Sequence, residues 1–333
     1  MSKLLVNFPP GFFTVPAVRA ALDRAAAQVD AVRLTSHNTP DEIRADLAWA
    51  DRLIYWSWPA LDDALLDVAP NLRWSGQLDC GRAAAETALR RGLPVSLAKG
   101  CWSPAVAEMA LTLALGLLRR TSDHHAAMRA GREAWVADFP GDIDPREREL
   151  SGRPVGIIGF GRIGRRLREL LAPFGCRVLV HDPFLPAAAA QAAQVEAMPL
   201  HDLLRGVDVV VLCAANTGGT AKLIGAPEIA LLRRDAVFIN VARAALVDHQ
   251  ALAARLAQGE LVAALDVFDQ EPLAADSPLR GLPNLHLTPH RAGGLLASVD
   301  RGLGWLADDL GRSLAGQPLQ HALTPAMLPG LDG

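Results

Sequence analysis

Three glycines in a G-x-G-x-x-G spacing constrain this chain more than any other feature of its sequence. They follow the apolar run Val155–Ile158, which predicts a buried strand, and they open a helical pattern that starts at Ile163. In such a strand–turn–helix, Gly159 permits the tight turn, Gly161 lets the backbone approach a pyrophosphate, and Gly164 lets helix and strand pack closely. The N–H groups that begin the helix then face the phosphates. The motif predicts a doubly wound α/β domain that binds a dinucleotide.

An acidic residue follows the next predicted strand at the distance that dinucleotide binding requires. Asp182 lies 18 residues after Gly164, and an acid about 20 residues on accepts hydrogen bonds from the adenosine ribose hydroxyls. Its carboxylate would repel a 2′-phosphate, and Pro183 and Phe184 supply no cation for one. The sequence therefore favours NAD over NADP. The alternative is a structural glycine turn with Asp182 as an ordinary helix cap.

Length and composition describe a folded protein of about two domains, since a domain takes roughly 100–200 residues. The chain has 333 residues, of which 50% are hydrophobic and 21% are charged, and its net charge is −3. A mostly disordered chain would be poorer in apolar residues and more strongly charged. The small negative charge also disfavours a protein that binds nucleic acid through net positive charge.

The chain has four cysteines, Cys80, Cys101, Cys176 and Cys213. None forms a C-x-x-C pair, so we expect free thiols in a reducing compartment, with no disulfide frame and no metal site. The N-terminal residues predict a strand and lack the basic start and long apolar core of a signal peptide. The most apolar helical stretch, Ala105–Leu118, carries Glu108 and is predicted to be too short to span a bilayer. We therefore expect a cytoplasmic protein with no membrane partner.

Short apolar runs and helical patterns alternate along two stretches of the chain, which predicts two mostly parallel sheets covered by helices. The first stretch has predicted strands at residues 4–8, 53–56, 72–75 and 94–97 and helices at 15–28, 40–49 and 83–91. The second has predicted strands at residues 155–159, 177–181, 207–213, 236–240, 261–266 and 285–287 and helices at 163–174, 199–205, 226–232 and 248–258. Between them, residues 104–130 predict one long apolar helix that is buried nearly all round. A final helix is predicted at residues 296–314.

Three residues suited to one reaction follow three different predicted strands of the second series: Arg243, Glu271 and His290. Ligands of open α/β sheets bind at the carboxyl ends of the strands. A guanidinium holds a carboxylate as a planar fork, and a histidine exchanges a proton near neutral pH. A glutamate orients the imidazole and favours its charged form. The set predicts a site for 2-hydroxy acids. Taken singly, the three residues could be a surface cation, a turn acid before Pro272 and a structural loop histidine.

The segments around these residues resemble the D-isomer-specific 2-hydroxyacid dehydrogenase family, over nearly the whole chain. The matching segments are residues 149–164, Val247-Asp248, Asp266-Val267-Phe268, Glu271-Pro272 and Thr288-Pro289-His290. The resemblance implies an NAD-dependent enzyme that interconverts an (R)-2-hydroxy acid and its 2-oxo acid. In it, Arg243 would bind the substrate carboxylate, His290 would be the acid/base and Glu271 would be its partner.

The resemblance also implies a domain arrangement. A Rossmann-type NAD domain, residues 101–296, would be inserted into a flavodoxin-like substrate domain made of residues 1–100 and 297–333. Family members are commonly dimers through the cofactor domain, so we expect a homodimer that acts on a small-molecule substrate. The residues expected to bind the cofactor are Gly159, Gly161, Arg162, Ile163, Gly164, Asp182, Val241, Ala242 and Asp266.

The chain departs from the family pattern at three places. Ala244 stands where a glycine usually follows the arginine, and residues 212–215 lack the usual proline. Residues 76–81 replace a Gly-rich loop that holds the substrate carboxylate in the family. The alanine bears on the turn geometry after the arginine, and the altered loop bears on the identity of the substrate.

Four tryptophans bear on the substrate and on assembly. Trp56, Trp58 and Trp102 lie in segments that resemble cleft-facing loops, and Trp135 matches a tryptophan that reaches a partner subunit. Plain packing is the alternative for each. If two or more of the first three face the cleft, the substrate side chain is expected to be apolar or aromatic.

Several functions remain open on the sequence alone. A glyoxylate/hydroxypyruvate reductase and a phosphite dehydrogenase-like enzyme use related residues. A non-catalytic NAD(H)-sensing scaffold of the corepressor kind can keep them too. Turnover of a 2-oxo acid with NADH separates the enzymes from the scaffold.

Overall fold

The computed structural model describes residues 1–331 and divides into two compact units. Unit 1 comprises Met1–Trp102 and the described residues from Gly294 onward, and unit 2 comprises Ser103–Gly293. The sequence predicts the junctions at residues 100–101 and 296–297. Its assignment of the substrate to the first unit and the cofactor to the second stays a prediction.

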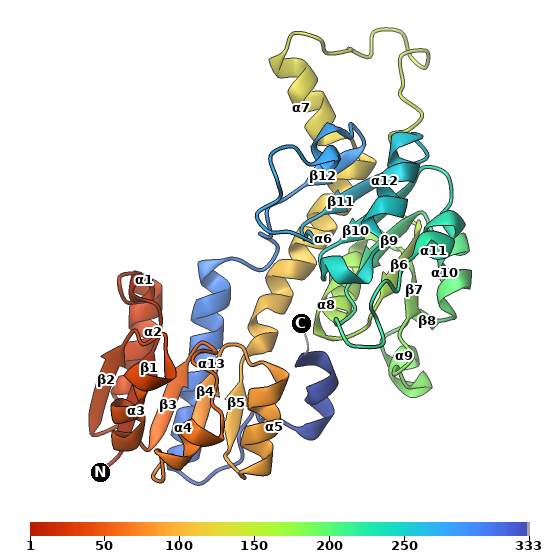
Figure 1. Ribbon diagram of the computed structural model, residues 1–333. Coiled ribbons are helices and arrows are strands. Elements are labelled where there is room, and N and C mark those ends of the chain that lie inside the picture. Colours follow the sequence, from red (N-terminus) through yellow and green to blue (C-terminus); the bar gives the residue numbers. More distant parts are fainter. Residues whose placement is uncertain (332–333) are drawn as a thin grey trace. The chain divides into compact units, whose positions relative to one another are not determined.

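Unit 1 contains a five-stranded, wholly parallel sheet in the order β2-β1-β3-β4-β5 (Figure 1). Its strands are β1 Lys3–Asn7, β2 Ala31–Thr35, β3 Arg52–Tyr55, β4 Trp74–Gln77 and β5 Val95–Leu97. Its helices are α1 Pro10–Phe13, α2 Pro16–Ala26, α3 Pro40–Trp49, α4 Asp63–Asp67, α5 Arg82–Arg90 and, from the far end of the chain, α13 Leu296–Leu314. The order is the flavodoxin-like one, which confirms the predicted fold of this part.

The edge strand β2 is the strand that the sequence pattern misses in unit 1. Arg33 and Leu34 are exposed, and no residue of β2 is fully buried. Arg33 pairs with Asp46 at 2.6 Å and lies over the ring of Trp49. Because an edge strand buries so little, it carries no apolar run to mark it.

The helix α13 joins unit 1 through one apolar face and one buried carboxylate. Leu303, Leu306 and Leu310 are buried against the sheet and α2. The wholly buried Asp309 accepts hydrogen bonds from Ser96 Oγ at 2.8 Å and from the N–H groups of residues 320 and 321 at 2.8 and 2.9 Å. Together with the hydrogen bond from the N–H of Leu97 to the carbonyl oxygen of residue 321, these contacts hold residues 320 and 321 beside β5.

Unit 2 contains a seven-stranded, wholly parallel sheet in the order β12-β11-β10-β9-β6-β7-β8 (Figure 1). Its strands are β6 Pro154–Ile158, β7 Arg177–His181, β8 Glu196–Ala197, β9 Val209–Leu212, β10 Ala236–Asn240, β11 Leu261–Leu265 and β12 Leu285–Leu287. Its helices are α6 Ser103–Leu118, α7 Thr121–Arg129, α8 Arg162–Leu171, α9 Ala187–Ala192, α10 Leu200–Gly206, α11 Ala226–Leu231 and α12 His249–Ala257. The chain reverses between β6 and β9, as in a Rossmann fold, so the predicted fold is confirmed here too.

The single long helix predicted at residues 104–130 is wrong. Arg120 has a left-handed backbone, with φ of 51°, and it separates α6 from α7. Its guanidinium pairs with Asp123 at 2.8 Å and with Asp144, which holds the break in place. The helix α6 packs on α8, β10 and β11 but leaves Glu108 and Thr112 exposed, so it is not buried all round.

The predicted length of the apolar helix also needs correction. Within residues 1–331, one continuous stretch, Lys99–Leu118, is 20 residues long and apolar enough to cross a membrane by length and composition, and half of it is buried. The stretch is longer than predicted because a turn of 3-10 helix, Lys99–Trp102, precedes α6.

All four cysteines are free. Burial and the nearby Asp79 raise the pKa of the Cys80 thiol to about 11. Burial raises the pKa of Cys101 and of Cys213 to about 12. Such thiols stay protonated at neutral pH and are poor nucleophiles. In the described part of the chain, no group of three or more His, Cys, Asp or Glu side chains is arranged to hold a metal ion.

Candidate active site

Two of the three glycines after β6, Gly159 and Gly164, lie where a side chain has no room. Gly159 has φ of +88°, and a Cβ there would come within 2.5 Å of the Ala214 backbone, which follows β9. A Cβ on Gly164 would come within 2.5 Å of the Gly159 carbonyl oxygen. A Cβ on Gly161 would meet nothing within 4 Å, so the space in front of the first turn of α8 is open. The turn therefore has the close packing and the free backbone approach that the motif predicts.

Asp182 follows β7, and its side chain links the end of β7 to the glycine turn. Its Oδ2 accepts a hydrogen bond from the N–H of Phe160 at 2.7 Å, and its Oδ1 accepts one from the N–H of Phe184 at 2.9 Å. A carboxylate has about four lone-pair sites, so it can accept further hydrogen bonds. Asp182 therefore lies against the glycine turn in the half-buried position expected of a residue that binds ribose hydroxyls.

Arg243 follows β10 on a turn that a buried amide shapes. The Asn240 side chain, wholly buried, accepts from the N–H of Ala242 at 3.0 Å and donates to the carbonyl oxygen of Arg243 at 3.1 Å. The guanidinium of Arg243 donates to the Ala242 carbonyl at 2.9 Å. These bonds orient the arginine beyond the carboxyl end of the sheet.

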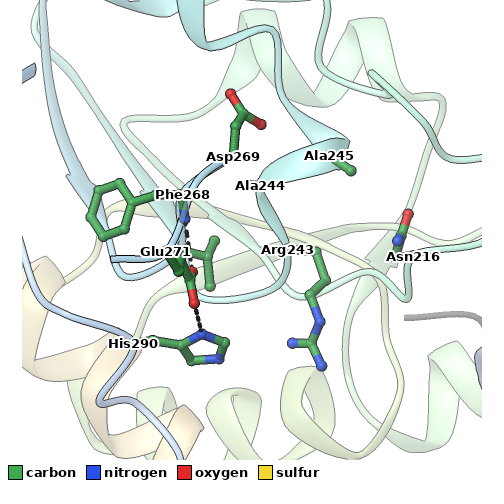
Figure 2. A pocket seen from close by; sticks show the side chains of 9 residues that line it. Asn216, Arg243, Ala244, Ala245, Phe268, Asp269, Glu271 and His290 are labelled. Carbon is green, nitrogen blue, oxygen red and sulfur yellow. Dashed lines mark hydrogen bonds and ion pairs between the residues drawn. The ribbon is translucent and has the colours of Figure 1, made fainter. Parts of the chain in front are cut away.

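His290 and Glu271 form a hydrogen-bonded pair. His290 Nδ1 lies 2.7 Å from Glu271 Oε2, and Glu271 Oε1 accepts from the N–H of Phe268 at 3.0 Å (Figure 2). Because an ionised carboxylate only accepts, Nδ1 carries the proton of this bond and Nε2 is left for another partner. His290 has φ of 50°, an uncommon backbone conformation for a histidine. Strained backbone of this kind clusters at active sites.

The pair also determines the charge of Glu271. Partial burial alone would raise the pKa of Glu271, but the hydrogen bonds from His290 and Phe268, with the charges of His290 and Arg243, hold this pKa below its usual value. Glu271 is therefore a carboxylate at neutral pH, and it accepts the hydrogen bond from Nδ1 of His290.

Arg243, Glu271 and His290 line one cavity of about 380 Å³ in unit 2. The guanidinium and the imidazole reach the same side of it (Figure 2). The other lining residues are Asn216, Ala244, Ala245, Val267, Phe268 and Asp269. The structure thus brings together, at the carboxyl ends of three strands, the three residues that the sequence selects for chemistry.

A family model covers this unit. Residues 111–292, more than half of the chain, match the model described as "D-isomer specific 2-hydroxyacid dehydrogenase, NAD binding domain". The chain belongs to this family. Its NAD-binding domain carries the glycine turn, Asp182 and Arg243, so NAD is the cofactor that the family assigns to unit 2.

The chain spans a different share of the length of each relative in the 2-hydroxyacid dehydrogenase family. A glyoxylate reductase from Aeropyrum pernix is 34% identical over 251 residues, which cover 73% of this chain and 73% of that protein. A D-3-phosphoglycerate dehydrogenase from Methanocaldococcus jannaschii is 29% identical over 307 residues, which cover 91% of this chain but only 57% of that protein. The crystal structure of a phosphoglycerate oxidoreductase from Rhizobium etli matches with a TM-score of 0.80 and 27% identity, covering 96% of this chain and 97% of that one.

The residues predicted to bind NAD in this family domain all follow strands of unit 2 at their carboxyl ends. Gly159, Gly161, Arg162, Ile163 and Gly164 follow β6, Asp182 follows β7, Val241 and Ala242 follow β10, and Asp266 follows β11. The open space at Gly161 and the carboxylate of Asp182 fit a dinucleotide. The individual contacts of these residues with the cofactor stay predictions.

Asp266 has a further role that the family motif does not reveal. It is buried, and its two oxygens accept from Thr288 Oγ1 at 2.6 Å and from the N–H groups of Arg291 and Ala292 at 2.8 and 2.9 Å. Its backbone carbonyl accepts from the N–H of His290 at 2.9 Å. Asp266 therefore fixes the loop that presents His290.

The departures from the family pattern have local explanations. Ala244 begins a short 3-10 helix and is not among the residues with positive φ, so it needs no glycine there. Ala214, in the segment that lacks the usual proline, packs its backbone against Gly159. In unit 1, Gln77 lies within β4, and Asp79 accepts from the N–H of Cys80 at 2.9 Å. The N–H groups of Leu78 and Asp79 donate to the carbonyl oxygens of residues 55 and 56, so three N–H groups of the altered loop are already used by the chain itself.

The sequence pattern misses the residues that orient the site. Asn216 lines the cavity, Asn240 shapes the turn of Arg243, and Thr288 links Asp266 to the histidine loop. The only signal for Asn240 is a polar residue at the end of the buried run Ala236–Ile239. A buried polar side chain needs hydrogen-bond partners, and the adjacent turn supplies them.

Proposed function

We propose that the protein is an NAD-dependent oxidoreductase that interconverts an (R)-2-hydroxy acid and its 2-oxo acid. The observation that carries the proposal is the 2.7 Å pair of His290 and Glu271 on a cavity that Arg243 also lines. The chain spans 57% of the length of the D-3-phosphoglycerate dehydrogenase from Methanocaldococcus jannaschii. The activity and the substrate class are therefore our own inference for this protein.

Each of the three residues has one task in this reaction. When bound, NADH supplies the hydride equivalent that the carbonyl carbon accepts. Arg243 binds the substrate carboxylate through charge-assisted hydrogen bonds from its planar guanidinium. His290, protonated at both nitrogens, donates the Nε2 proton to the carbonyl oxygen as the alcohol forms, and in the oxidation direction it takes that proton back. Glu271 accepts the Nδ1 hydrogen bond throughout and stabilises the imidazolium.

The cofactor preference follows from Asp182. Its carboxylate would lie where NADP carries a 2′-phosphate, and the electrostatic repulsion favours NAD. The two backbone N–H groups that already bind Asp182 hold its carboxylate in position. We therefore infer that NADH is used in preference to NADPH.

We further propose that the protein is a cytoplasmic homodimer. On unit 2, α7 has no buried residue, and the segment that follows it exposes Trp135 at 71%, Val136 at 63% and Phe139 at 76%. Exposed apolar groups on one segment mark a protein–protein contact, and a second copy of this chain is the partner that the family resemblance implies. The four free thiols support a reducing compartment. Light scattering is expected to give twice the chain mass, and Trp135→Ala to shift the protein toward monomer.

The test of the reaction is NADH oxidation with purified protein and a panel of 2-oxo acids, from glyoxylate through pyruvate to phenylpyruvate. We expect turnover of at least one acid and none in the absence of protein. Glyoxylate belongs in the panel because a glyoxylate reductase is among the relatives. If NADH binds but no acid is reduced, the NAD(H)-sensing scaffold replaces the enzyme as the function.

A further inference from the structure

The loop after β11 carries Glu271, and few bonds hold this loop in place. It comprises residues 267–272, of which Val267 and Phe268 are buried and residues 269–272 are exposed. Within the part of the chain that the structure describes, no hydrogen bond between backbone groups involves residues 267–272. The position of Glu271 therefore depends on apolar packing at the start of the loop and on hydrogen bonds made by side chains.

Among residues 1–331, three hydrogen bonds restrain this loop, and the carboxylates of Asp269 and Glu271 accept all of them. Glu271 accepts from the N–H of Phe268 at 3.0 Å and from His290 at 2.7 Å. Asp269 Oδ2 lies 3.0 Å from Nδ1 of His249, the first residue of α12. Because an ionised carboxylate only accepts, Nδ1 of His249 carries the proton of this bond. The two carboxylates point in opposite directions from the loop, Glu271 toward His290 and Asp269 away from it (Figure 2).

The beginning of α12 is a fixed point from which the loop can be held. Asp248, the residue before His249, caps the helix by accepting a hydrogen bond from the N–H of Ala251 at 3.0 Å. Its own N–H donates to the carbonyl oxygen of Ile224 at 2.9 Å. Leu252, in the first turn of the helix, is buried in the core of unit 2. His249 therefore extends from a backbone that hydrogen bonds and apolar packing hold in place.

The imidazole of His249 is itself confined. The side chain of His249 is 10% exposed, whereas the carboxylate of Asp269 that it binds is 68% exposed. Its Nε2 is buried, and no group within residues 1–331 forms a hydrogen bond with that atom. A buried polar atom without a partner lowers stability, and an apolar side chain of similar size would avoid this cost. Stability alone therefore does not explain a histidine at this position, whereas the bond from its Nδ1 to the loop does.

We propose that His249 is a positioning residue for the reaction. Through Asp269, its Nδ1–H holds residues 267–272 in the conformation in which Glu271 reaches His290. The inference rests on the proposed function and adds to it a residue that does not line the cavity. Asp269 precedes Glu271 by only two residues, so a loop that is released at Asp269 displaces the glutamate. A displacement of about 1 Å can cost up to about a hundredfold in rate.

The test measures kcat/KM for the reduction of a 2-oxo acid by NADH in variants of the full-length protein. His249→Leu keeps the apolar packing and removes the donor, so kcat/KM is expected to fall at least about threefold. Its melting temperature is expected to stay at or above the wild-type value, because the unpaired Nε2 is removed as well. Asp269→Ala is expected to match His249→Leu within about twofold, since each removes the same bond. If His249→Leu fails to fold, Asp269→Ala decides.

Two further variants are the rescue and the control. His249→Asn keeps an N–H donor at nearly the same place, because Nδ2 of asparagine and Nδ1 of histidine are both bonded to Cγ, and should recover about half of the loss or more. His201→Leu is the matched control, because His201 pairs with Glu228 at 2.8 Å outside the cavity. Its kcat/KM is expected to equal that of the wild type.

A double variant shows whether His249 acts through Glu271. In Glu271→Ala no carboxylate is left to position, so the addition of His249→Leu is expected to lower kcat/KM by less than about twofold. A histidine with a merely structural role would lower kcat/KM by the same factor in both backgrounds. An undiminished loss in the Glu271→Ala background, or a His249→Leu protein with wild-type kcat/KM, overturns the inference and leaves the proposed function standing.

A measurement without turnover separates the inference from the proposed function. In protein labelled with ¹⁵N-histidine, NMR detects the Nδ1 proton that His290 shares with Glu271, and its absence in His290→Asn assigns it. This resonance is expected in the wild type and in His249→Asn, and it should be lost or shifted in His249→Leu and Asp269→Ala. If no acid is turned over, the proposed function fails, yet a lost or shifted resonance still supports the positioning of Glu271. A resonance that neither variant changes overturns the inference.

Discussion

The two units contain sheets of the same kind whose carboxyl ends carry opposite chemistry. In unit 2 the connections after the strands carry glycines and charged or titratable groups, among them Gly159, Asp182, Arg243 and His290. In unit 1 the corresponding connections carry partly buried aromatic side chains in contact with one another, Phe12, Trp56, Trp58 and Trp102. Both sheets are parallel and both reverse their strand order once, so the fold gives each a ligand-binding edge. The residues placed there decide what each edge can bind.

In both units, buried polar side chains fix the loops at the carboxyl ends of the strands. In unit 2, buried Asn240 and Asp266 fix the loops that carry Arg243 and His290. In unit 1, buried Asn7 does the same for the loop of Trp58. Both units therefore use a buried polar side chain with filled hydrogen bonds to fix a loop, and in unit 2 the more exposed residue on that loop is the one to which we assign a function.

The largest effect is expected from the residue that we assign to proton transfer. His290→Asn should lower kcat/KM for 2-oxo acid reduction by roughly 10²- to 10⁴-fold, because a positioned general acid contributes about that much. The affinity for NADH, measured by fluorescence titration, should stay within about twofold. His201→Asn is the control, since His201 pairs with Glu228 at 2.8 Å on α11 and lies outside the cavity. A His290→Asn protein with more than a tenth of the wild-type activity would return His290 to a structural role.

The second largest loss of kcat/KM is expected at Arg243. Arg243→Ala removes charge-assisted hydrogen bonds worth about 1.5–3 kcal/mol, so kcat/KM should fall at least about tenfold while NADH affinity is nearly intact. Arg243→Lys should recover only part of the loss, because an ammonium group lacks the planar fork. Arg234→Ala, at a side chain 72% exposed, is the matched control. An unchanged kcat/KM in Arg243→Ala excludes its role with the carboxylate.

Glu271 should change the pH profile more than the maximum rate. Its pKa lies below the usual value, so in the wild type it is charged throughout the neutral range and places a negative charge 2.7 Å from Nδ1 of His290. Glu271→Gln removes that charge. The reduction rate should then begin to fall at a lower pH, and at neutral pH it should drop by roughly three- to tenfold.

The control for this profile is Glu260→Gln, because Glu260 pairs with Arg255 at 3.2 Å outside the cavity. A deuterated NADH must show an isotope effect, so that the profile reports the chemical step. If the Glu271→Gln profile then equals that of the wild type, Glu271 is only the turn acid before Pro272.

The smallest effect is expected at the cofactor. Asp182→Ala should weaken NADH binding several-fold and narrow the gap to NADPH, since it removes the repulsion of a 2′-phosphate. Asp202→Ala, at a carboxylate 65% exposed on α10, should leave both affinities as they are. Equal affinities for NADH and NADPH in the wild type would exclude the assigned preference.

The sequence predicts most strands of unit 2 because they are buried on both faces and form continuous apolar runs, as in Val209–Leu212. It misses β8, whose two residues are both exposed, and β2, which lies at an edge. It joins α6 and α7 because the break at Arg120 depends on backbone geometry and on ion pairs to Asp123 and Asp144 that no local pattern reveals.

The candidate site likewise has parts that local sequence patterns predict and parts that they do not. Glycine spacing and the position of Arg243, Glu271 and His290 after strands are local features, and the structure brings the three side chains to one cavity. The hydrogen bonds of Asp266 to residues 288–292 join segments more than twenty residues apart. The aromatic contacts of Trp56 with Phe12 and Trp102 span over forty residues each way. Such pairs depend on the tertiary fold and cannot be derived from spacing.

The central claim is that Arg243, Glu271 and His290, which line the cavity of unit 2, catalyse the reduction of a 2-oxo acid by NADH. The most direct measurement is the incubation of the protein with NADH deuterated at nicotinamide C4 and with the acid of the panel that it reduces fastest, followed by chiral analysis and mass spectrometry of the product. The account predicts the (R)-2-hydroxy acid with one deuterium at C2 from the wild type, and a yield at least a hundredfold lower from His290→Asn. The (S) product, a product without deuterium, or an equal yield from the variant would contradict it.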